Sequence, residues 1–222
     1  MQHQPNKADQ AYELLEEKIT FQELAPGQLL SEAMLMELTG LGRTPVREAL
    51  QRLARERMVE ILPRRGVFVA TISTEEHFRL LLELRRAMED LAVRLAVFRA
   101  ETPQKESMVE LSGRLDAFDG DDMRAFALLL KSVHGLVTAA AHNDYLQLAM
   151  APLQALSRRF WFAHLPDVTT HLAQAARMHS AILQAVAHGD ESVAVAASHS
   201  LNDYLIDVTY QALSAPRRTG IG

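Results

Sequence analysis

The chain has 222 residues, 48% of them hydrophobic, and a net charge of −5, which suits one large or two ordinary domains with a buried core. Because it contains no cysteine, disulfides and thiolate metal sites are excluded, and any metal would be held by histidines and carboxylates. There is no signal-peptide pattern and no run of about 18 uninterrupted apolar residues, so we expect a cytoplasmic protein without a membrane partner.

Helix breakers and caps divide the first third of the chain into short elements. We expect three helices, at about 8–24, 32–39 and 45–57. Thr44 is the expected cap of the third helix, and Pro45 fits its first position, where no amide hydrogen is needed. Branched and aromatic residues then flank a Pro/Gly turn between 59 and 72, which predicts a β-hairpin and the only sheet of the protein.

Long amphipathic helices follow from residue 75 onward. Proline, glycine and asparagine residues separate six of them, at about 75–101, 103–118, 121–142, 144–164, 168–188 and 191–213. Pro152 is expected to kink the fourth. We therefore predict a mainly α fold in two domains, with three helices and a hairpin at 1–72 and an all-α six-helix bundle at 73–222. The first six residues and the tail from Ala215 are expected to be disordered.

Basic residues are concentrated around the third helix. Between Arg43 and Arg65 there are seven arginines and three glutamates, a local charge of +4, so the rest of the chain carries −9. Such a segment is expected of a phosphate-binding surface, although a solvent-exposed helix face has the same composition. The start of this helix is expected to present Arg43, Thr44 and Arg47 outward, and arginines at a helix N-terminus suit both phosphates and guanine edges.

Four motifs stand out in segment 24–70: Leu24-Ala25-Pro26-Gly27, Leu30-Ser31-Glu32, the octet RTPVREAL at 43–50, and Pro63-Arg64-Arg65-Gly66. With these motifs the segment resembles the winged helix-turn-helix of the GntR superfamily. It implies a DNA-binding protein that contacts its operator through Arg43, Thr44, Arg47, Arg65 and Gly66, while Arg64 lies at the same hairpin tip. Gly42 occupies a position where the family usually has serine or threonine, and Ala33 one where arginine is common. Both departures remove possible DNA-backbone contacts, so we expect the operator to differ from the family norm.

Three histidines interrupt otherwise apolar faces of three predicted bundle helices: His134, His179 and His199. Neutral imidazoles from three helices suit one Zn or Ni ion in a bundle core. Taken one at a time, each histidine is better explained as a hydrogen-bonded core residue. The spacing alone leaves both interpretations open.

Five segments of residues 75–213 form a recognisable pattern: Leu84–Glu89, Val133-His134, His142–Leu146, His179–Val186 with Gly189-Asp190, and His199–Leu201. With them this region resembles the all-helical FCD ligand-binding domain of the FadR-like branch, and six helices indicate its VanR-type subgroup. In that branch an aspartate and three histidines hold a divalent metal that helps to bind a small carboxylate effector. The histidines correspond to His134, His179 and His199, but Leu130 stands at the aspartate position.

The loss of one anionic ligand at Leu130 leaves two interpretations of this site. Either the three histidines hold a metal, with Asp203 as a fourth ligand, or the pocket is metal-free and the histidines bind the effector directly. The resemblance also makes Arg85 and Asn143 candidate effector contacts. Arg85 is explained equally well by an ion pair with Glu89, four residues further along the helix.

Our leading hypothesis is a ligand-responsive transcription regulator, a homodimer that represses a metabolic operon from a pseudo-palindromic operator, and not an enzyme. The first alternative is a metal-dependent hydrolase, but no glutamate accompanies the histidines in a spacing such as HExxH. The second is a metal-free interaction bundle without a small ligand. In both alternatives the winged helix serves only as a scaffold.

Overall fold

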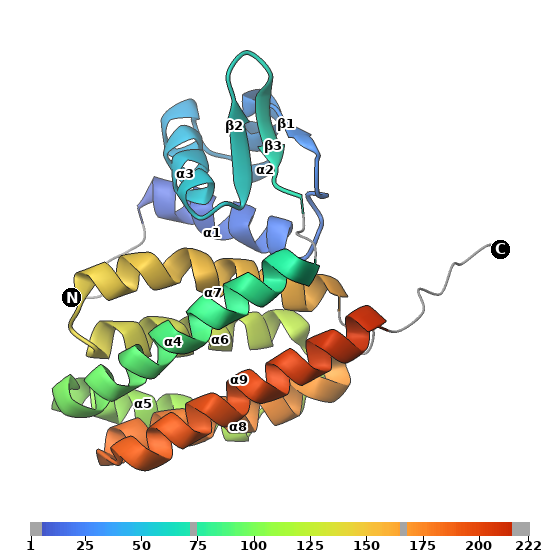
Figure 1. Cartoon of the computed structure of the whole chain (residues 1–222). Helices are drawn as coiled ribbons and strands as arrows, with labels where there is room; N and C mark the ends of the chain where they lie inside the picture. Colours follow the sequence, from blue (N-terminus) through green and yellow to red (C-terminus); the bar gives the residue numbers. More distant parts are fainter. Residues whose placement is uncertain (1–5, 72–74, 165–167, 215–222) are drawn as a thin grey trace. The chain divides into compact units, whose positions relative to one another are not determined.

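A computed structural model describes residues 6–71, 75–164 and 168–214, and the fold is mainly α-helical, as predicted (Figure 1). Contacts divide the chain into an N-terminal unit, residues 1–76 with 151–163, and a bundle unit, residues 77–150 with 164–222. The predicted domain boundary at 72/73 lies outside the described residues, as do the chain ends 1–5 and 215–222 for which disorder was expected.

The N-terminal unit begins with three helices, α1 (Lys7–Thr20), α2 (Glu32–Thr39) and α3 (Arg43–Arg55). Asn6 and Ser31 cap the first two, because their side-chain oxygens accept backbone N–H groups three residues ahead. The predicted apolar face of α3 is buried against α1 and α2 and consists of Val46, Ala49, Leu50 and Leu53. The helix-turn-helix is therefore held by a continuous apolar core.

Helix α3 begins earlier than predicted, and Thr44 is not its cap. Gly42 is the extended N-cap, and Arg43 and Thr44 belong to the first turn. Pro45 is tolerated there because the first amides of a helix have no partner within it, and the first helical hydrogen bond runs from Val46 N to Gly42 O at 3.3 Å. The residues of the RTPVREAL octet thus lie on the helix from its first residue.

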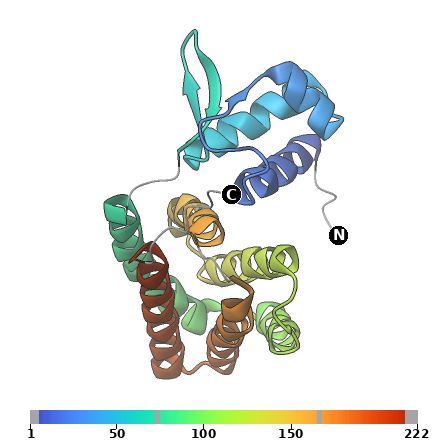
Figure 2. The same cartoon turned by 90° about the vertical axis from the view of Figure 1, so that its right-hand side faces the viewer.

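The wing is a three-stranded antiparallel sheet, so the prediction of a two-stranded hairpin was incomplete. Strands β2 (Val59–Leu62) and β3 (Gly66–Val69) form the expected hairpin, and β1 (Leu29–Leu30) pairs with the other edge of β3. Gly66 has φ 107°, a backbone conformation that residues with a Cβ rarely adopt, so glycine is favoured at the start of β3. Figure 2 shows the hairpin projecting from the helices of its own unit.

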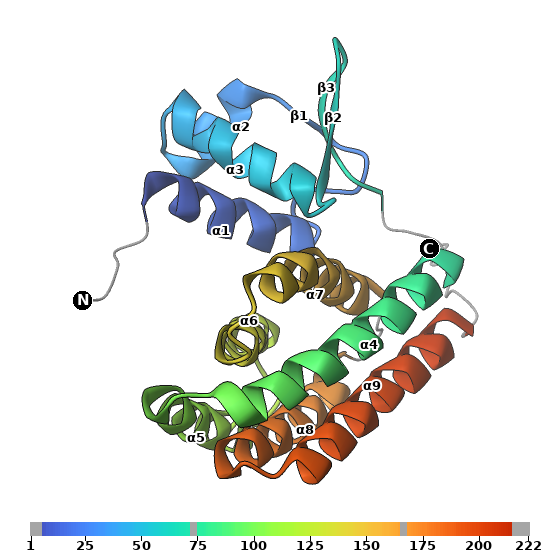
Figure 3. The same ribbon diagram turned by 60° about the vertical axis from the view of Figure 1, so that its left-hand side comes forward.

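Six helices occupy the remaining described chain, each within a few residues of its predicted range. They are α4 (Glu75–Arg99), α5 (Thr102–Asp116), α6 (Met123–Ala140), α7 (Asp144–His164), α8 (Val168–His188) and α9 (Glu191–Ser214). Helix α8 packs against α5, α6 and α9, and Figure 3 shows α4 and α9 side by side. Leu115, Phe126, Leu172 and Leu183 are fully buried between these helices.

Helix α6 is long and apolar enough to cross a membrane by length and composition alone, and it is the one such helix among the described residues. Its apolar side chains Phe126, Leu130 and Val133 are nevertheless buried against other helices. A helix in the core of a soluble helical bundle meets the same test of length and composition.

Helix α7 is shared by the two units. Residues 144–150 belong to the bundle unit, and Ala151–Ala163 belong to the N-terminal unit. The helix continues through Pro152, which has no amide hydrogen to donate to the carbonyl of Leu148. The helix therefore lacks one backbone hydrogen bond close to the boundary between the units.

The second half of α7 is anchored to the N-terminal unit by apolar and polar contacts. Ala155 is part of the core formed by α1, α2 and α3. Arg158 Nη2 lies 3.1 Å from Glu16 Oε1 on α1, and both side chains are buried. Arg159 donates from Nη2 to the carbonyl of Ala70, at the end of the wing. Burial lowers the pKa of Arg159 to about 10, so it remains protonated at neutral pH.

Candidate DNA-binding surface and ligand site

The predicted DNA contacts lie on two exposed features of the N-terminal unit. Arg43, Thr44 and Arg47 occupy the exposed first turn and a half of α3, where unpaired backbone amides and arginine charges coincide. The tip of the wing presents Arg64 and Arg65, both exposed. The Arg65 guanidinium carbon lies 6.0 Å from the centre of the Phe68 ring, so an aromatic side chain supports the tip.

Glu32, at the start of α2, is a residue of this surface that no sequence pattern indicated as functional. Arg47 donates from Nε to Glu32 Oε1 at 2.5 Å and from Nη2 to Oε2 at 3.2 Å. Arg43 Nε lies 3.3 Å from the same Oε2. The hydrogen bond from Arg47 lowers the pKa of Glu32, so this carboxylate is ionised at neutral pH.

Two of the three predicted histidines meet inside the bundle unit. The rings of His134 and His179 are 5.9 Å apart between centroids, and both residues are buried. His179 Nδ1 lies 2.7 Å from the carbonyl of Ala175, to which it donates, so Nε2 carries the lone pair. That Nε2 is buried without a hydrogen-bond partner among the described residues. Burial lowers the pKa of His179 to about 4, so the ring is neutral at pH 7.

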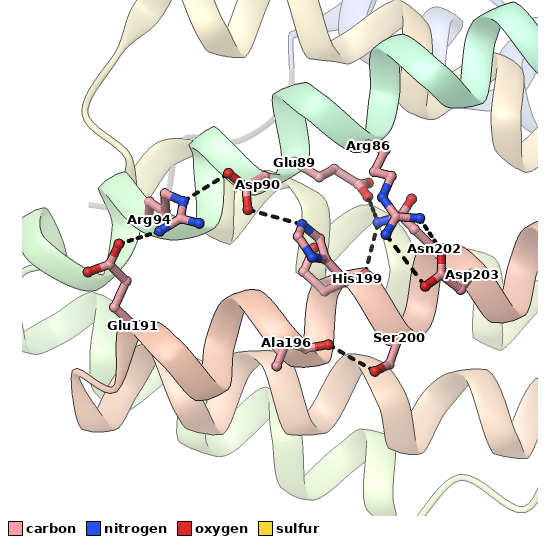
Figure 4. A network of polar contacts seen from close by, with 11 residues as sticks. Arg86, Glu89, Asp90, Arg94, Glu191, Ala196, His199, Ser200, Asn202 and Asp203 are labelled. Carbon is pink, nitrogen blue, oxygen red and sulfur yellow. Dashed lines mark hydrogen bonds and ion pairs between the residues drawn. The ribbon is translucent and has the colours of Figure 1, made fainter.

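The other two predicted metal ligands are held elsewhere. His199 Nε2 lies 3.1 Å from Asp90 Oδ1, and Asp203 forms an ion pair with Arg86 (Figure 4). Within the described ranges no group of three or more histidine, aspartate or glutamate side chains is placed to hold a metal. Leu130 is a buried apolar residue. Among the described residues, His134 and His179 thus lie together, while His199 and Asp203 contact other side chains.

A buried ion pair accompanies the histidines. Arg85 Nε donates to Glu89 Oε1 at 2.7 Å, and Asn202 Nδ2 donates to Glu89 Oε2 at the same distance. Of the two explanations weighed for Arg85, the structure thus shows the pair with Glu89. Both charges act on the pKa of His179, Arg85 lowering it and Glu89 raising it, which places the pair near that ring.

Asn143, the other predicted effector contact, has a structural role at the start of α7. Its Oδ1 accepts the backbone N–H of Leu146 at 3.1 Å, which satisfies one of the free amides at the helix N-terminus. The side-chain NH₂ group is the part of this residue that a ligand would contact.

A winged helix-turn-helix followed by a helical bundle defines a class of DNA-binding transcription regulators. The sequence profile of "Bacterial regulatory proteins, gntR family" matches residues 7–69, and that of the FCD domain matches residues 80–203. The chain belongs to the GntR family of bacterial regulatory proteins and carries an FCD domain of the FadR-like branch.

Similar proteins include the Nta operon transcriptional regulator of Aminobacter aminovorans, 28% identical over 177 residues, which span 78% of this chain and 81% of the relative. The galactonate operon transcriptional repressor of Escherichia coli K12 is 27% identical over 216 residues, 85% of this chain and 90% of the relative. The solved structure of E. coli McbR/YncC has a TM-score of 0.79 at 19% identity, covering 94% of this chain and 99% of that one. That likeness shows the fold.

Proposed function

We propose that the protein is a cytoplasmic, homodimeric repressor of a metabolic operon that binds a pseudo-palindromic operator and responds to a small carboxylate. The observation that carries the proposal is that the N-terminal unit has both an exposed basic first turn of α3 and a projecting hairpin with an exposed basic tip. The relatives that are named as operon regulators and repressors support the same role, and none of those described above is named as an enzyme. We assign no catalysis to the chain.

The test is an electrophoretic shift with the intergenic DNA that flanks the gene, at several salt concentrations. We expect sequence-specific complexes with two chains per duplex, as counted by analytical ultracentrifugation, because two winged domains match two half-sites. No specific, salt-sensitive complex with any flanking segment would contradict the proposal.

Replacing arginines separates base reading from phosphate binding. We expect Arg47→Ala to lower operator affinity about 10- to 100-fold with a much smaller effect on scrambled DNA, because a lost bidentate guanine contact penalises only the cognate sequence. Arg65→Ala should weaken both complexes alike and reduce the salt slope by about one, as the loss of one phosphate contact does. The exposed Arg114 on α5, replaced by alanine, is the matched control and should change neither.

We propose that the effector site is formed by Arg85, His134 and His179. One N–H of Arg85 is used by Glu89, so others are available to a carboxylate. The Nε2 lone pair of His179 can accept a hydrogen bond from a ligand hydroxyl. A hydroxycarboxylate supplies both groups, and a metal is not required. Effector binding would then shift the two winged domains of the dimer away from the half-site spacing.

Thermal unfolding with galactonate, malate and citrate tests this ligand class. We expect at least one hydroxy acid to raise the Tm by several degrees, because about 2.7 kcal/mol of stabilisation is available at 100 times the Kd. The rise should persist after dialysis against EDTA. Arg85→Lys should abolish it while retaining the charge beside Glu89, because lysine lacks the planar fork. A rise that appears only with added Zn or Ni would favour a metal site, and no rise together with no bound metal would favour an interaction bundle.

A further inference from the structure

We infer that Glu32 is a positioning residue for operator recognition, which holds Arg47 by one edge of its guanidinium so that the other edge is presented to a base. The inference rests on the proposed DNA-reading role of α3. Glu32 is at the first position of α2, and its carboxylate bridges to the first turns of α3.

The atoms of the contact determine which edge remains available. A guanidinium has a side edge, formed by Nε and Nη2, and an end edge, formed by Nη1 and Nη2. Glu32 takes the side edge of Arg47, since Nε donates to Oε1 and Nη2 donates to Oε2. The end edge has the two parallel donors that match O6 and N7 of guanine. The Arg47 side chain is 60% exposed, so this edge is accessible to DNA.

Holding the side chain raises specificity in two ways. An unrestrained arginine loses rotamer freedom when it binds a base, and the contact with Glu32 removes part of that freedom beforehand. The carboxylate also offsets the charge of Arg47 and of Arg43, whose Nε is 3.3 Å away, so both arginines attract phosphates of any sequence less strongly. Glu32 thus favours specific binding, in which the end edge of Arg47 contacts a base, over non-specific binding to phosphates.

Glu32 has little part in holding the fold together. Exposed ion pairs contribute little to stability, and both Arg47 and Arg43 are largely exposed. Ser31 caps α2 independently of Glu32, through its own hydroxyl. A Glu32→Gln variant should therefore fold normally, and a change in its DNA binding would report recognition.

The experiment compares Glu32→Gln with Glu37→Gln, which removes the same charge from an exposed position of the same helix. The probes are a duplex selected from a random-sequence library by the wild-type protein and a duplex with the same bases in scrambled order. Fluorescence anisotropy at fixed salt gives the two Kd values. The measured quantity is the specificity ratio, which is the Kd for the scrambled duplex divided by the Kd for the selected duplex. We expect Glu32→Gln to lower this ratio about tenfold, with Glu37→Gln within about twofold of wild type.

Arg47→Ala and the Glu32→Gln/Arg47→Ala double variant complete a double-mutant cycle. Because Glu32 acts through Arg47, its replacement should have almost no effect on the ratio in the Arg47→Ala background. If Arg47→Ala keeps wild-type specificity, the proposed reading role of α3 is wrong. If Arg47→Ala loses specificity but Glu32→Gln matches Glu37→Gln, or if Glu32→Gln has its full effect without Arg47, the inference about Glu32 is overturned.

Discussion

Replacing Arg158 with methionine is expected to lower the free energy of unfolding of the N-terminal unit by about 3–5 kcal/mol. The reason is the carboxylate of Glu16, which is 3% exposed and lies 3.1 Å from the Arg158 guanidinium. Without the guanidinium, the Glu16 carboxylate would remain buried without this opposite charge, while the Thr20 hydroxyl still donates to its Oε1 at 3.3 Å. The loss should therefore exceed that of an ordinary surface substitution several-fold.

Trp161 makes this measurement specific to the N-terminal unit. It is the only tryptophan of the chain and lies buried in the same half of α7 as Arg158, so its fluorescence during urea unfolding follows this unit. Arg114→Met, at an exposed position of α5, is the control and should change stability by less than about 0.5 kcal/mol. Glu16→Gln/Arg158→Met should recover part of the loss, since it removes the buried negative charge that Arg158 no longer offsets. A double variant no more stable than Arg158→Met would rule out this electrostatic explanation.

His179 is expected to make the stability of the bundle unit fall as the pH is lowered from 7 towards 4. Its pKa is about 4 in the folded protein against 6.5 for an exposed histidine, because burial disfavours the charged ring. The unfolded chain therefore takes up a proton first, and unfolding is favoured below pH 6.5. The contribution is complete above pH 6.5, is lost as the pH falls to about 4, and amounts to about 3 kcal/mol.

His179→Asn tests this linkage, because the amide nitrogen of asparagine can replace Nδ1 as donor to Ala175 but does not titrate. Unfolding followed by far-UV circular dichroism should show a shallower dependence of stability on pH, reduced by up to about 1.4 kcal/mol per pH unit. His188 is the matched control, an exposed histidine on the same helix whose Nδ1 contacts the carbonyl of Gln184 at 2.6 Å. If His179→Asn and His188→Asn retain the same slope as wild type, burial of His179 does not control the pH response.

The sequence predicted the helices well because their signals are local. Apolar residues at helical spacing, as at Val46, Leu50 and Leu53, define a buried face without knowledge of the partner helix. Strand β1 was missed because two residues cannot show an alternation of apolar and polar side chains, and its pairing with Val67 and Phe68 is a long-range contact. The start of α3 was misplaced because proline fits any of the first helical positions.

The candidate sites were predicted less completely, since they depend on contacts between elements. His199 shares a helical face with apolar residues, but its partner is Asp90 on α4, which no pattern within α9 could indicate. The contact between Glu32 and Arg47 joins two helices in the same way. By contrast, the ion pair of Arg85 with Glu89 lies within one helix, and its spacing of four residues made it a predicted alternative.

The division of α7 between the units has a consequence for the recombination of DNA-binding and ligand-binding domains in this family. A gene fusion that joins residues 1–76 to the ligand-binding domain of another regulator would replace the α7 that supplies the present contacts of Arg158 with Glu16 and of Arg159 with the Ala70 carbonyl. Where the foreign α7 has no arginine at the position of Arg158, the chimera would keep its DNA-reading surface but bury Glu16 without this ion pair. Successful recombination therefore requires Glu16 and Arg158 to be transferred together, although 142 positions separate them in the chain.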